Sequence, residues 1–485
     1  MKTLNIGDKS GNGQITIVDE DRLCYLVKSV SKGAVGYRTI SKALVQEFVS
    51  YIENHPEVPI NEVRFKISGQ SEIDKYEYGY GATIGVMAKM LLGQEGIVRD
   101  TTIDAIISTK HISSNEYLPY LTSLRTKPFM LLAGISGTGK SRIVREMAKA
   151  CWKEGDEEFG KNCPRNFCMV QVKPNWHDSS ELIGYVTRIS GTPEFVSGPF
   201  LTFMAKAIKE PNVPYFLCLD EMNLAPVEQY FAEYLSVIES RKVNKDPVSG
   251  QTIIETDPII KPNGSQEYTD LIGKLLGDEE RMKGTTLTIP QNLFVVGTVN
   301  MDETTFSFSR KVLDRAMTIE MNEVDLHGGL EKATGNEIGY IGNCIIGDAA
   351  EGSDVYEENK ELCDQVLAYL EQVNAILEGT PFKIAYRTRN EFLMYAVNRQ
   401  ILAKESQLWQ TLDEMTSMKI LSRIEGDSDR TGKVLEDMQE LVKEQIVSQI
   451  PPAEEGKPEL KSISATKIKE MLDKLKASSF TSYWT

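Results

Sequence analysis

Paired cysteines and clustered histidines are missing from this chain of 485 residues. Its seven cysteines form no Cys-x-x-Cys pair, and its four histidines do not cluster with them. Metal-binding thiols usually come in closely spaced pairs, and disulfide-rich proteins are small and dense in cysteine. We therefore expect neither a structural zinc site nor a disulfide framework, and we expect free thiols in the interior.

Long apolar stretches are missing as well. No uninterrupted apolar run approaches the length that spans a bilayer, and Met1–Gly7 lacks the apolar stretch of a signal peptide. With 41% hydrophobic and 26% charged residues, the composition is that of an ordinary soluble protein. These features predict a cytoplasmic protein that makes no membrane contact.

An excess of positive charge is also absent, because the formal net charge is −16 at pH 7. This charge argues against a uniformly basic surface for nucleic acid, although a basic pore or patch can exist within an acidic protein. The length exceeds what one hydrophobic core normally supports. We therefore expect two or three domains.

The spacing of apolar residues divides the chain into three parts, of which residues 1–115 are the first. This part combines a strand-like piece near Gln14–Val18 with helical spacing at Ile40–Ile52 and Ala82–Leu92. The mixture predicts a separate small α+β module.

Residues 116–322 contain short buried strands that alternate with helices, which is typical of a parallel sheet covered on both faces. The expected strands are Phe129–Ala133, Phe167–Val172, Tyr215–Leu219 and Leu293–Thr298. Two polar, turn-rich insertions interrupt this part, a hairpin-like one at Gly184–Pro199 and a longer one at Lys242–Pro290. The fold class is therefore expected to be α/β.

Residues 323–485 are mostly helical. The clearest helices are expected at Glu361–Leu377, Arg389–Val397, Lys433–Ser448 and Ser464–Leu475. We therefore expect an all-α C-terminal domain.

Eight consecutive residues match the phosphate-loop pattern G-x-x-x-x-G-K-[ST]. They are Gly134, Ile135, Ser136, Gly137, Thr138, Gly139, Lys140 and Ser141. Because a strand precedes them and a helix follows, the glycines would let backbone N–H groups turn toward phosphate oxygens, assisted by the helix N-terminus. Lys140 would neutralise the β- and γ-phosphates, and Ser141 would bind Mg²⁺. The sequence predicts a nucleotide site.

A pair of carboxylates follows downstream, where the apolar strand Tyr215–Leu219 ends in Asp220 and Glu221. In a Walker-B arrangement Asp220 would hold Mg²⁺ through water, and Glu221 would orient and polarise the attacking water. An acidic strand end can also serve only as a helix cap. Its distance downstream of a phosphate loop favours the catalytic interpretation.

A third polar position closes the strand that begins at Leu293, and it is occupied by Asn300. Ligands of parallel sheets bind at the carboxyl ends of the strands. We therefore expect Asn300 to hydrogen-bond the attacking water or a γ-phosphate oxygen.

Two arginines, Arg310 and Arg315, follow this strand. Arginines in this part of the chain cannot easily fold back to their own phosphate loop. They can reach the site of a neighbouring subunit and stabilise transition-state charge in trans.

Phosphate loop, Asp-Glu pair, polar strand end and trailing arginine, in this order, resemble an AAA+ ring ATPase. The finer wording resembles the McrB-like branch of that superfamily, near the MoxR and dynein-related group. The resemblance covers about residues 116–485 and rests on Asn175–Tyr185, Leu219–Glu228, Val296–Glu303, Ser309–Ala316, Tyr386–Glu391 and Lys419–Ile424. It implies an AAA+ P-loop αβα domain with a C-terminal helical lid, assembled as a hexameric ring.

The resemblance also implies roles for single residues. Asn300 would be sensor 1, and Arg315, ahead of Arg310, would be the arginine finger. Arg387 would be the sensor-2 arginine of the lid, with Arg389 as the alternative. Either of these two arginines could instead be an ordinary surface residue of a helix.

The base of the nucleotide stays open between ATP and GTP. The restriction subunit after which the branch is named prefers GTP, but its sensor-1 asparagine lies in a Met-Asn-Thr-Ala-Asp-Arg sequence. The present chain differs there, with Val299–Thr304 reading Val-Asn-Met-Asp-Glu-Thr, and it has no Asn-Lys-x-Asp guanine motif. We favour ATP as the cofactor, together with Mg²⁺.

The resemblance implies an oligomeric Mg²⁺-dependent NTPase that acts as the motor or switch of an McrBC-like restriction or antiphage system. The chain has no Pro-Asp…Asp/Glu-x-Lys nuclease core, so cleavage would require a separate McrC-like nuclease or other effector. Residues 1–115 or the pore of the ring would contact DNA. One alternative is a MoxR-type ATPase that remodels a protein complex without DNA. Another is a nucleotide-binding scaffold, against which the intact Glu221 argues.

Overall fold

The computed structural model describes two compact units, Met1–Lys110 with Asp246–Gln251 and His111–Lys245 with Thr252–Thr485. The described residues are 8–10, 15–20, 24–31, 34–41, 45, 49–50, 52, 87–88, 97–99, 115–245, 252–300, 308–322, 338–403, 406–452 and 460–484.

The N-terminal unit contains an antiparallel sheet with the strand order β4-β3-β2-β1-β5. The strands are Asp8–Ser10 (β1), Ile15–Glu20 (β2), Cys24–Ser31 (β3), Ala34–Ser41 (β4) and Ile97–Arg99 (β5). β2 confirms the strand predicted near Gln14–Val18, although Gln14 itself lies outside the described residues.

Helical structure also occurs in this unit. Met87 and Ala88, inside the helix predicted at Ala82–Leu92, are helical, and the rest of that segment lies outside the described residues. The helix predicted from Ile40 is wrong at its start, because Ile40 pairs with Tyr25 of the neighbouring strand. Helical spacing is a local signal and takes no account of cross-strand pairing, which here extends β4 to Ser41.

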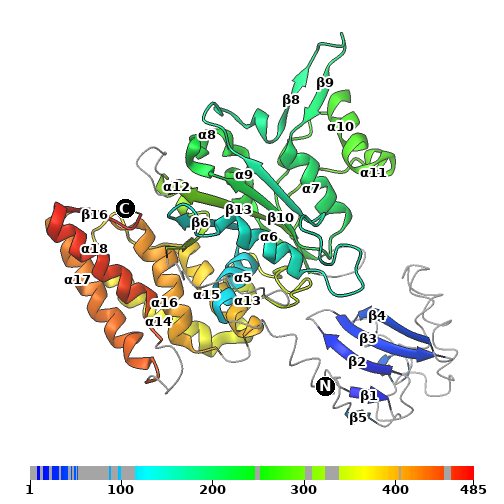
Figure 1. The fold of residues 1–485 in the computed structure, drawn as a ribbon. Helices are drawn as coiled ribbons and strands as arrows, with labels where there is room; N and C mark the ends of the chain where they lie inside the picture. The colour runs from blue at the N-terminus through cyan, green and yellow to red at the C-terminus, as the bar shows by residue number, and fades with distance from the viewer. Residues whose placement is uncertain are drawn as a thin grey trace. The chain divides into compact units, whose positions relative to one another are not determined.

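A parallel sheet forms the centre of the second unit (Figure 1). Its spatial order is β14-β6-β13-β10-β7, with the bounds Phe129–Gly134 (β6), Phe167–Gln171 (β7), Tyr215–Asp220 (β10), Leu293–Asn300 (β13) and Met317–Glu320 (β14). β6, β7, β10 and β13 confirm the four predicted strands. β14 is too short for the sequence pattern to indicate, and it is formed by pairing with β6. Because β13 lies between β6 and β10, the carboxyl ends of these three strands are neighbours.

Helices cover both faces of this sheet, which confirms the predicted αβα arrangement. They are Leu118–Thr126 (α5), Lys140–Ala150 (α6), Pro199–Lys209 (α7), Val227–Tyr230 (α8) and Ala232–Val237 (α9). Successive strand residues point to opposite faces. Met130 and Phe216 therefore pack with α5 and α6, whereas Leu131 and Leu217 pack with α7 and α9.

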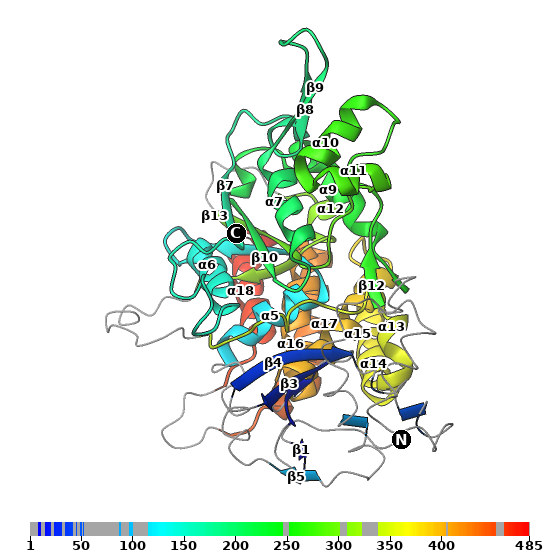
Figure 2. The same cartoon turned by 90° about the vertical axis from the view of Figure 1, so that its right-hand side faces the viewer.

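Both predicted insertions form secondary structure of their own. The first is an antiparallel hairpin of Gly184–Thr187 (β8) and Glu194–Ser197 (β9), as predicted, and it extends away from the sheet (Figures 1 and 2). The second contains Lys242–Lys245 (β11), Thr252–Glu255 (β12), Gln266–Leu276 (α10) and Asp278–Lys283 (α11). The hairpin tip exposes Ile189 almost completely.

The C-terminal region is mainly helical, as predicted, and its helices gather on one side of the sheet (Figure 1). They are Ser353–Tyr356 (α13), Lys360–Ile376 (α14), Tyr386–Leu402 (α15), Leu408–Met415 (α16), Ser428–Gln445 (α17) and Ile463–Ser478 (α18). A pair of short strands, Glu425–Asp427 (β15) and Phe480–Ser482 (β16), corrects the all-α expectation. The helices share one apolar core, to which the edge strand β14 contributes Met317. Among the described helices, none is long and apolar enough to cross a membrane.

Candidate nucleotide site

The predicted phosphate loop connects the end of β6 directly to the start of α6. Gly137 and Gly139 have φ values of +89° and +85°, a left-handed conformation that glycine adopts without strain. A Cβ atom at either position would meet no atom within 4 Å, so the backbone is bare on that side. Residues 134–141 thus have the local geometry that lets backbone N–H groups approach a phosphate.

Lys140, the first residue of α6, folds its side chain back over this loop. Its Nζ donates to the carbonyl oxygens of Gly134 at 3.0 Å and Ile135 at 2.7 Å. Burial lowers the pKa of the ammonium, and the nearby carboxylates of Asp220 and Glu221 oppose that shift. The loop therefore encloses a positive charge next to two negative ones.

Ser141 and Asp220 lie together at the carboxyl edge of the sheet. The Ser141 hydroxyl donates to Asp220 Oδ1 at 2.6 Å, and Thr298 Oγ1 donates to the same oxygen at 2.8 Å. Hydroxyl and carboxylate oxygens are the ligands that Mg²⁺ prefers, and Mg²⁺ usually takes its other ligands from substrate phosphates and water. These side chains fit such an ion.

Glu221 follows Asp220 in a strained backbone conformation. Its φ is +54°, which is uncommon for a residue with a side chain. The Glu221 N–H donates to Thr298 Oγ1 at 3.0 Å, and Glu221 Oε1 accepts from Asn300 Nδ2 at 3.1 Å. The strain turns an exposed carboxylate toward the amide at the end of β13.

The strand order explains why these residues meet. Asn300 is paired in register with Gly134, the last residue of β6, and Asp220 ends β10 on the other side of β13. Three segments that are far apart in sequence therefore present lysine, carboxylate and amide side chains at one edge of the sheet. Thr298 was not singled out by the sequence, although it faces the same side of β13 as Asn300.

The predicted arginines lie at the other end of the sheet. Arg315 lies two residues before β14, and its Nε and Nη1 donate to the carbonyls of Leu235 at 2.9 Å and Lys311 at 2.8 Å. Arg315 Nε also lies 3.7 Å from Glu239 Oε1, and Arg387, at the start of α15, forms an ion pair with Glu239 Oε2. Glu239 is thus a shared partner that the sequence motifs do not indicate.

The contact of Lys127 with Glu239 shows where Arg315, Arg387 and Glu239 lie relative to the phosphate loop. Its Nζ lies 3.7 Å from Glu239 Oε1, and Lys127 precedes β6, whereas the phosphate loop follows β6. Five steps along a strand separate Phe129 from Gly134, which is about 17 Å at the usual rise per residue. Arg315 and Arg387 therefore lie at the end of the sheet opposite the phosphate loop of their own chain.

The alternative arginines have different surroundings. Arg310 lies 3.2 Å from Glu425 Oε1 and its guanidinium covers the ring of Phe382. Arg389 donates to Asn390 Oδ1 and covers the ring of Tyr386. Neither has a described ion pair with Glu239, so the structure groups Arg315 with Arg387 and leaves Arg310 and Arg389 outside that pair.

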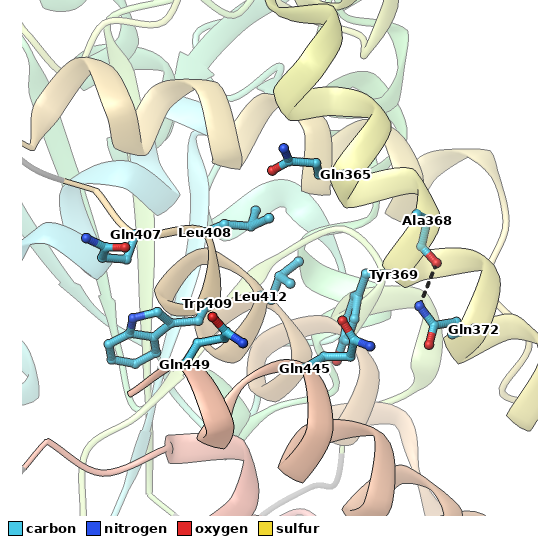
Figure 3. A pocket seen from close by; sticks show the side chains of 10 residues that line it. All are labelled: Gln365, Ala368, Tyr369, Gln372, Gln407, Leu408, Trp409, Leu412, Gln445 and Gln449. Carbon is cyan, nitrogen blue, oxygen red and sulfur yellow. Dashed lines mark hydrogen bonds between the residues drawn. The ribbon is translucent and has the colours of Figure 1, made fainter. Parts of the chain in front are cut away.

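A cavity of about 340 Å³ lies elsewhere, between α14, α16 and α17 (Figure 3). Besides Trp409 and Tyr369, its lining includes Gln365, Gln372, Gln407, Gln445 and Gln449. None of its lining residues belongs to the phosphate loop, to β10 or to β13. The candidate nucleotide site is therefore the carboxyl edge of the sheet and not this cavity.

The sheet residues match a known family. Residues 129–316 match the model of the AAA domain (dynein-related subfamily), and residues 346–480 match a domain of unknown function, DUF8727. A curated relative, the type IV methyl-directed restriction enzyme EcoKMcrB subunit of Escherichia coli (strain K12), is 22% identical over 329 residues, which is 67% of this chain. These matches support an McrB-like AAA+ ATPase, with its AAA domain at residues 129–316.

The AAA domain family implies binding of a nucleoside triphosphate and Mg²⁺. The match to the curated relative covers 60% of that protein's length. A crystal structure of a candidate ATPase from Cytophaga hutchinsonii is 15% identical and covers 71% of this chain and 86% of its own, with a TM-score of 0.31.

Proposed function

We propose that this McrB-like chain hydrolyses a nucleoside triphosphate and acts as the motor or switch subunit of a restriction or antiphage defence complex. One observation supports hydrolysis above all: Asn300 and Glu221 are 3.1 Å apart beside Lys140 and the Ser141–Asp220 pair. A site that only binds nucleotide needs the phosphate loop, but it does not need a carboxylate held by an amide.

The proposed reaction is an in-line attack of water on the γ-phosphorus. Glu221 orients and polarises the water, and Asn300 holds the Glu221 carboxylate or the water in place. Lys140 and the backbone N–H groups of residues 137–141 neutralise the phosphate oxygens. Ser141 and Asp220 would hold Mg²⁺, which would supply Lewis-acid stabilisation of the charge on these oxygens.

Arg315 and Arg387 are proposed to complete the pocket of a neighbouring subunit. They lie at the opposite end of the sheet from their own phosphate loop, and both are partly exposed. A guanidinium at the γ-phosphate stabilises the transition state strongly. This arrangement supports action in trans and hence a ring, for which we propose a hexamer.

The partners of the ring are proposed from the resemblance and from the curated relative. The chain would be cytoplasmic, with residues 1–115 as the recognition module, 116–322 as the nucleotide-binding domain and 323–485 as the lid. DNA would be contacted through the recognition module or the pore, and cleavage would be left to an McrC-like nuclease. ATP is favoured over GTP because the chain has no guanine-reading motif.

A second candidate function is that of a MoxR-type ATPase which remodels a protein complex. The net charge of −16 favours this alternative, since DNA repels an acidic surface. Stimulation of turnover by DNA separates the two candidates: the restriction motor is expected to respond, and the protein remodeller is not.

Steady-state hydrolysis of ATP and GTP by the purified chain tests the proposal. The mass of the assembly should be measured with and without a slowly hydrolysed analogue. Hydrolysis of one nucleotide by a nucleotide-dependent hexamer is expected. A chain that binds nucleotide as a monomer and never turns it over, with or without DNA, would exclude an autonomous ring motor.

Mixed rings test action in trans. Arg315→Ala and Lys140→Ala should each abolish turnover, and a mixture of the two chains should regain part of it. In such a ring, the intact pocket of the first variant meets the intact finger of the second. A mixture that stays inactive at every ratio argues that Arg315 does not act on a neighbour.

A further inference from the structure

The segment that carries Arg315 is fixed by a buried lysine of the helical region. Lys419 Nζ donates to three backbone carbonyls of this segment, those of Leu313 at 3.3 Å, Asp314 at 3.3 Å and Ala316 at 2.9 Å. These carbonyls lie at the C-terminal end of the short helix Arg310–Leu313 (α12) and just beyond it, where backbone oxygens carry partial negative charge. One ammonium therefore binds backbone carbonyl oxygens on both sides of Arg315.

Lys419 is itself held by a buried carboxylate. Its Nζ lies 2.7 Å from Glu391 Oε2, and Glu391 Oε1 accepts from Lys127 Nζ at 2.5 Å. Lys419 and Glu391 are each only 2% exposed. Breaking a buried ion pair by removing one partner is costly, so this network fixes the lysine firmly. Through Lys127 it also reaches Glu239, the partner of both arginines.

A second contact lies close by. Arg423 Nη2 forms an ion pair with Asp314 Oδ1 at 2.7 Å, and Asp314 immediately precedes Arg315. Lys419 and Arg423 both belong to the sequence word Lys419–Ile424, which the phosphate site does not explain. Their common target is the backbone and side chains of residues 313–316.

The backbone at Lys419 is unusual. Residues Thr416–Ile420 form a π-helical turn between α16 and the 3₁₀ turn Leu421–Arg423. π-helical turns are rare and occur frequently at functional sites. This turn also packs against β14, the strand that Arg315 precedes.

We propose that Lys419 is a positioning residue for the arginine finger, through which the helical region holds Arg315 in the geometry that the neighbouring pocket needs. The proposal rests on the proposed function, in which Arg315 acts in trans. Lys419 does not touch the nucleotide. Lys419 of one subunit thereby determines the rate of hydrolysis in the neighbouring subunit, while the nucleotide pocket of its own subunit stays intact.

The expected effect of Lys419→Met is therefore a loss in kcat with little change in KM. We expect a ten- to hundredfold decrease, because a small displacement of a catalytic group has this effect and loss of the finger itself costs more. Arg423→Ala should give a smaller loss of the same kind, since Arg423 is partly exposed and its replacement is easily accommodated.

Mixed rings of full-length chains test the proposal. Lys419→Met chains, which keep their pocket, should regain activity when mixed with Lys140→Ala chains, which keep their finger. They should regain none when mixed with Arg315→Ala chains, because both then lack a working finger. If Lys419→Met does not fold, as judged by circular dichroism, the same mixtures are made with Arg423→Ala.

Arg399→Met is the matched control. Arg399 is also a buried cation of the helical region, but it pairs with Glu414 at 3.1 Å and has no described hydrogen bond or ion pair with residues 313–316. Its chains should turn over nucleotide at close to the native rate wherever they fold. An equal loss of kcat in this variant would show a general effect of lid damage and would overturn the proposal.

The Arg315→Ala and Lys140→Ala mixture separates the role of Lys419 from the action of Arg315 in trans. If that mixture regains activity and the Lys419→Met and Lys140→Ala mixture does not, only the role of Lys419 is overturned. If neither mixture regains activity, action in trans is wrong and the role of Lys419 is wrong with it.

Discussion

Arg315 and Arg387 meet on one carboxylate, that of Glu239, although 72 residues separate them in sequence. The Glu239 side chain also lies 3.7 Å from Lys127 Nζ. Arg315, two residues before the edge strand β14, and Arg387, in the first turn of α15, thereby contact the same carboxylate. Two arginines that serve one neighbouring pocket would need such a fixed relative position.

Glu239→Gln is expected to lower kcat by about ten- to a hundredfold. Arg387 loses its described ion-pair partner, whereas Arg315 keeps the carbonyls of Leu235 and Lys311. Nucleotide affinity should stay unchanged, because the variant's own phosphate loop is at the other end of the sheet. Steady-state kinetics with a binding titration measures both. A faster enzyme would mean that Glu239 withholds the arginines and does not position them.

Glu221→Gln should retain nucleotide binding and lower turnover by at least about a hundredfold, because the water loses its orienting base. The amide keeps the size of the side chain, so assembly with nucleotide should be preserved. Glu233→Gln is the matched control, since this exposed glutamate of α9 has no described partner in the site. Native turnover in Glu221→Gln would refute the Walker-B assignment.

Gly134→Ala should loosen the phosphate loop. Gly134 has a φ of +150°, and an added Cβ would lie 2.4 Å from the carbonyl oxygen of Met321 and 2.7 Å from Asn322 Oδ1. Asn322 Oδ1 accepts from the Ile135 N–H, so the clash displaces a loop contact. We expect a loss of about 1–3 kcal/mol in the free energy of unfolding and weaker nucleotide binding.

Thermal unfolding and a nucleotide titration measure these two effects. Gly160→Ala is the control, because Gly160 has a φ of +75° but a Cβ there meets nothing within 4 Å. It should show only the smaller cost of a left-handed alanine and bind nucleotide normally. Equal behaviour of both variants would mean that the contact with Met321 is unimportant.

Glu414 predicts a pH dependence of stability. Burial raises its pKa to about 7, against the opposing effects of Arg399 and Tyr395. Between the ordinary pKa of about 4.5 and pH 7 the folded state binds the proton more tightly than the unfolded state. The contribution of Glu414 to the free energy of unfolding therefore falls as the pH rises through this window, by roughly 3 kcal/mol.

Glu414→Gln removes this titration. The difference in free energy of unfolding between the native chain and the variant should shift by most of that amount between pH 5 and pH 8, as measured by denaturant unfolding at each pH. The rest of the chain titrates equally in both proteins and cancels. A difference that stays constant across the range would contradict a raised pKa at Glu414.

Much of the nucleotide site could be predicted because its parts are contiguous. Residues 134–141 form a single turn whose shape is set by glycines, and Asp220 and Glu221 are adjacent at a strand end. Asn300 could be placed from the end of its apolar strand. Thr298, two residues earlier, could not, since nothing in the sequence indicates that its hydroxyl would donate to Asp220.

The sequence by itself determined the parallel sheet, the helical C-terminal region and the phosphate loop, because apolar spacing and glycine conformation act over a few residues. The tertiary structure decided the rest. Insertion of β13 between β6 and β10 brings Asn300 to Glu221, and the packing of the helices on β14 brings Lys419 to the Arg315 segment, 103 residues away at Ala316. Such contacts depend on the spatial order of the strands in the sheet and on which residues are buried together. Long-range packing determines both.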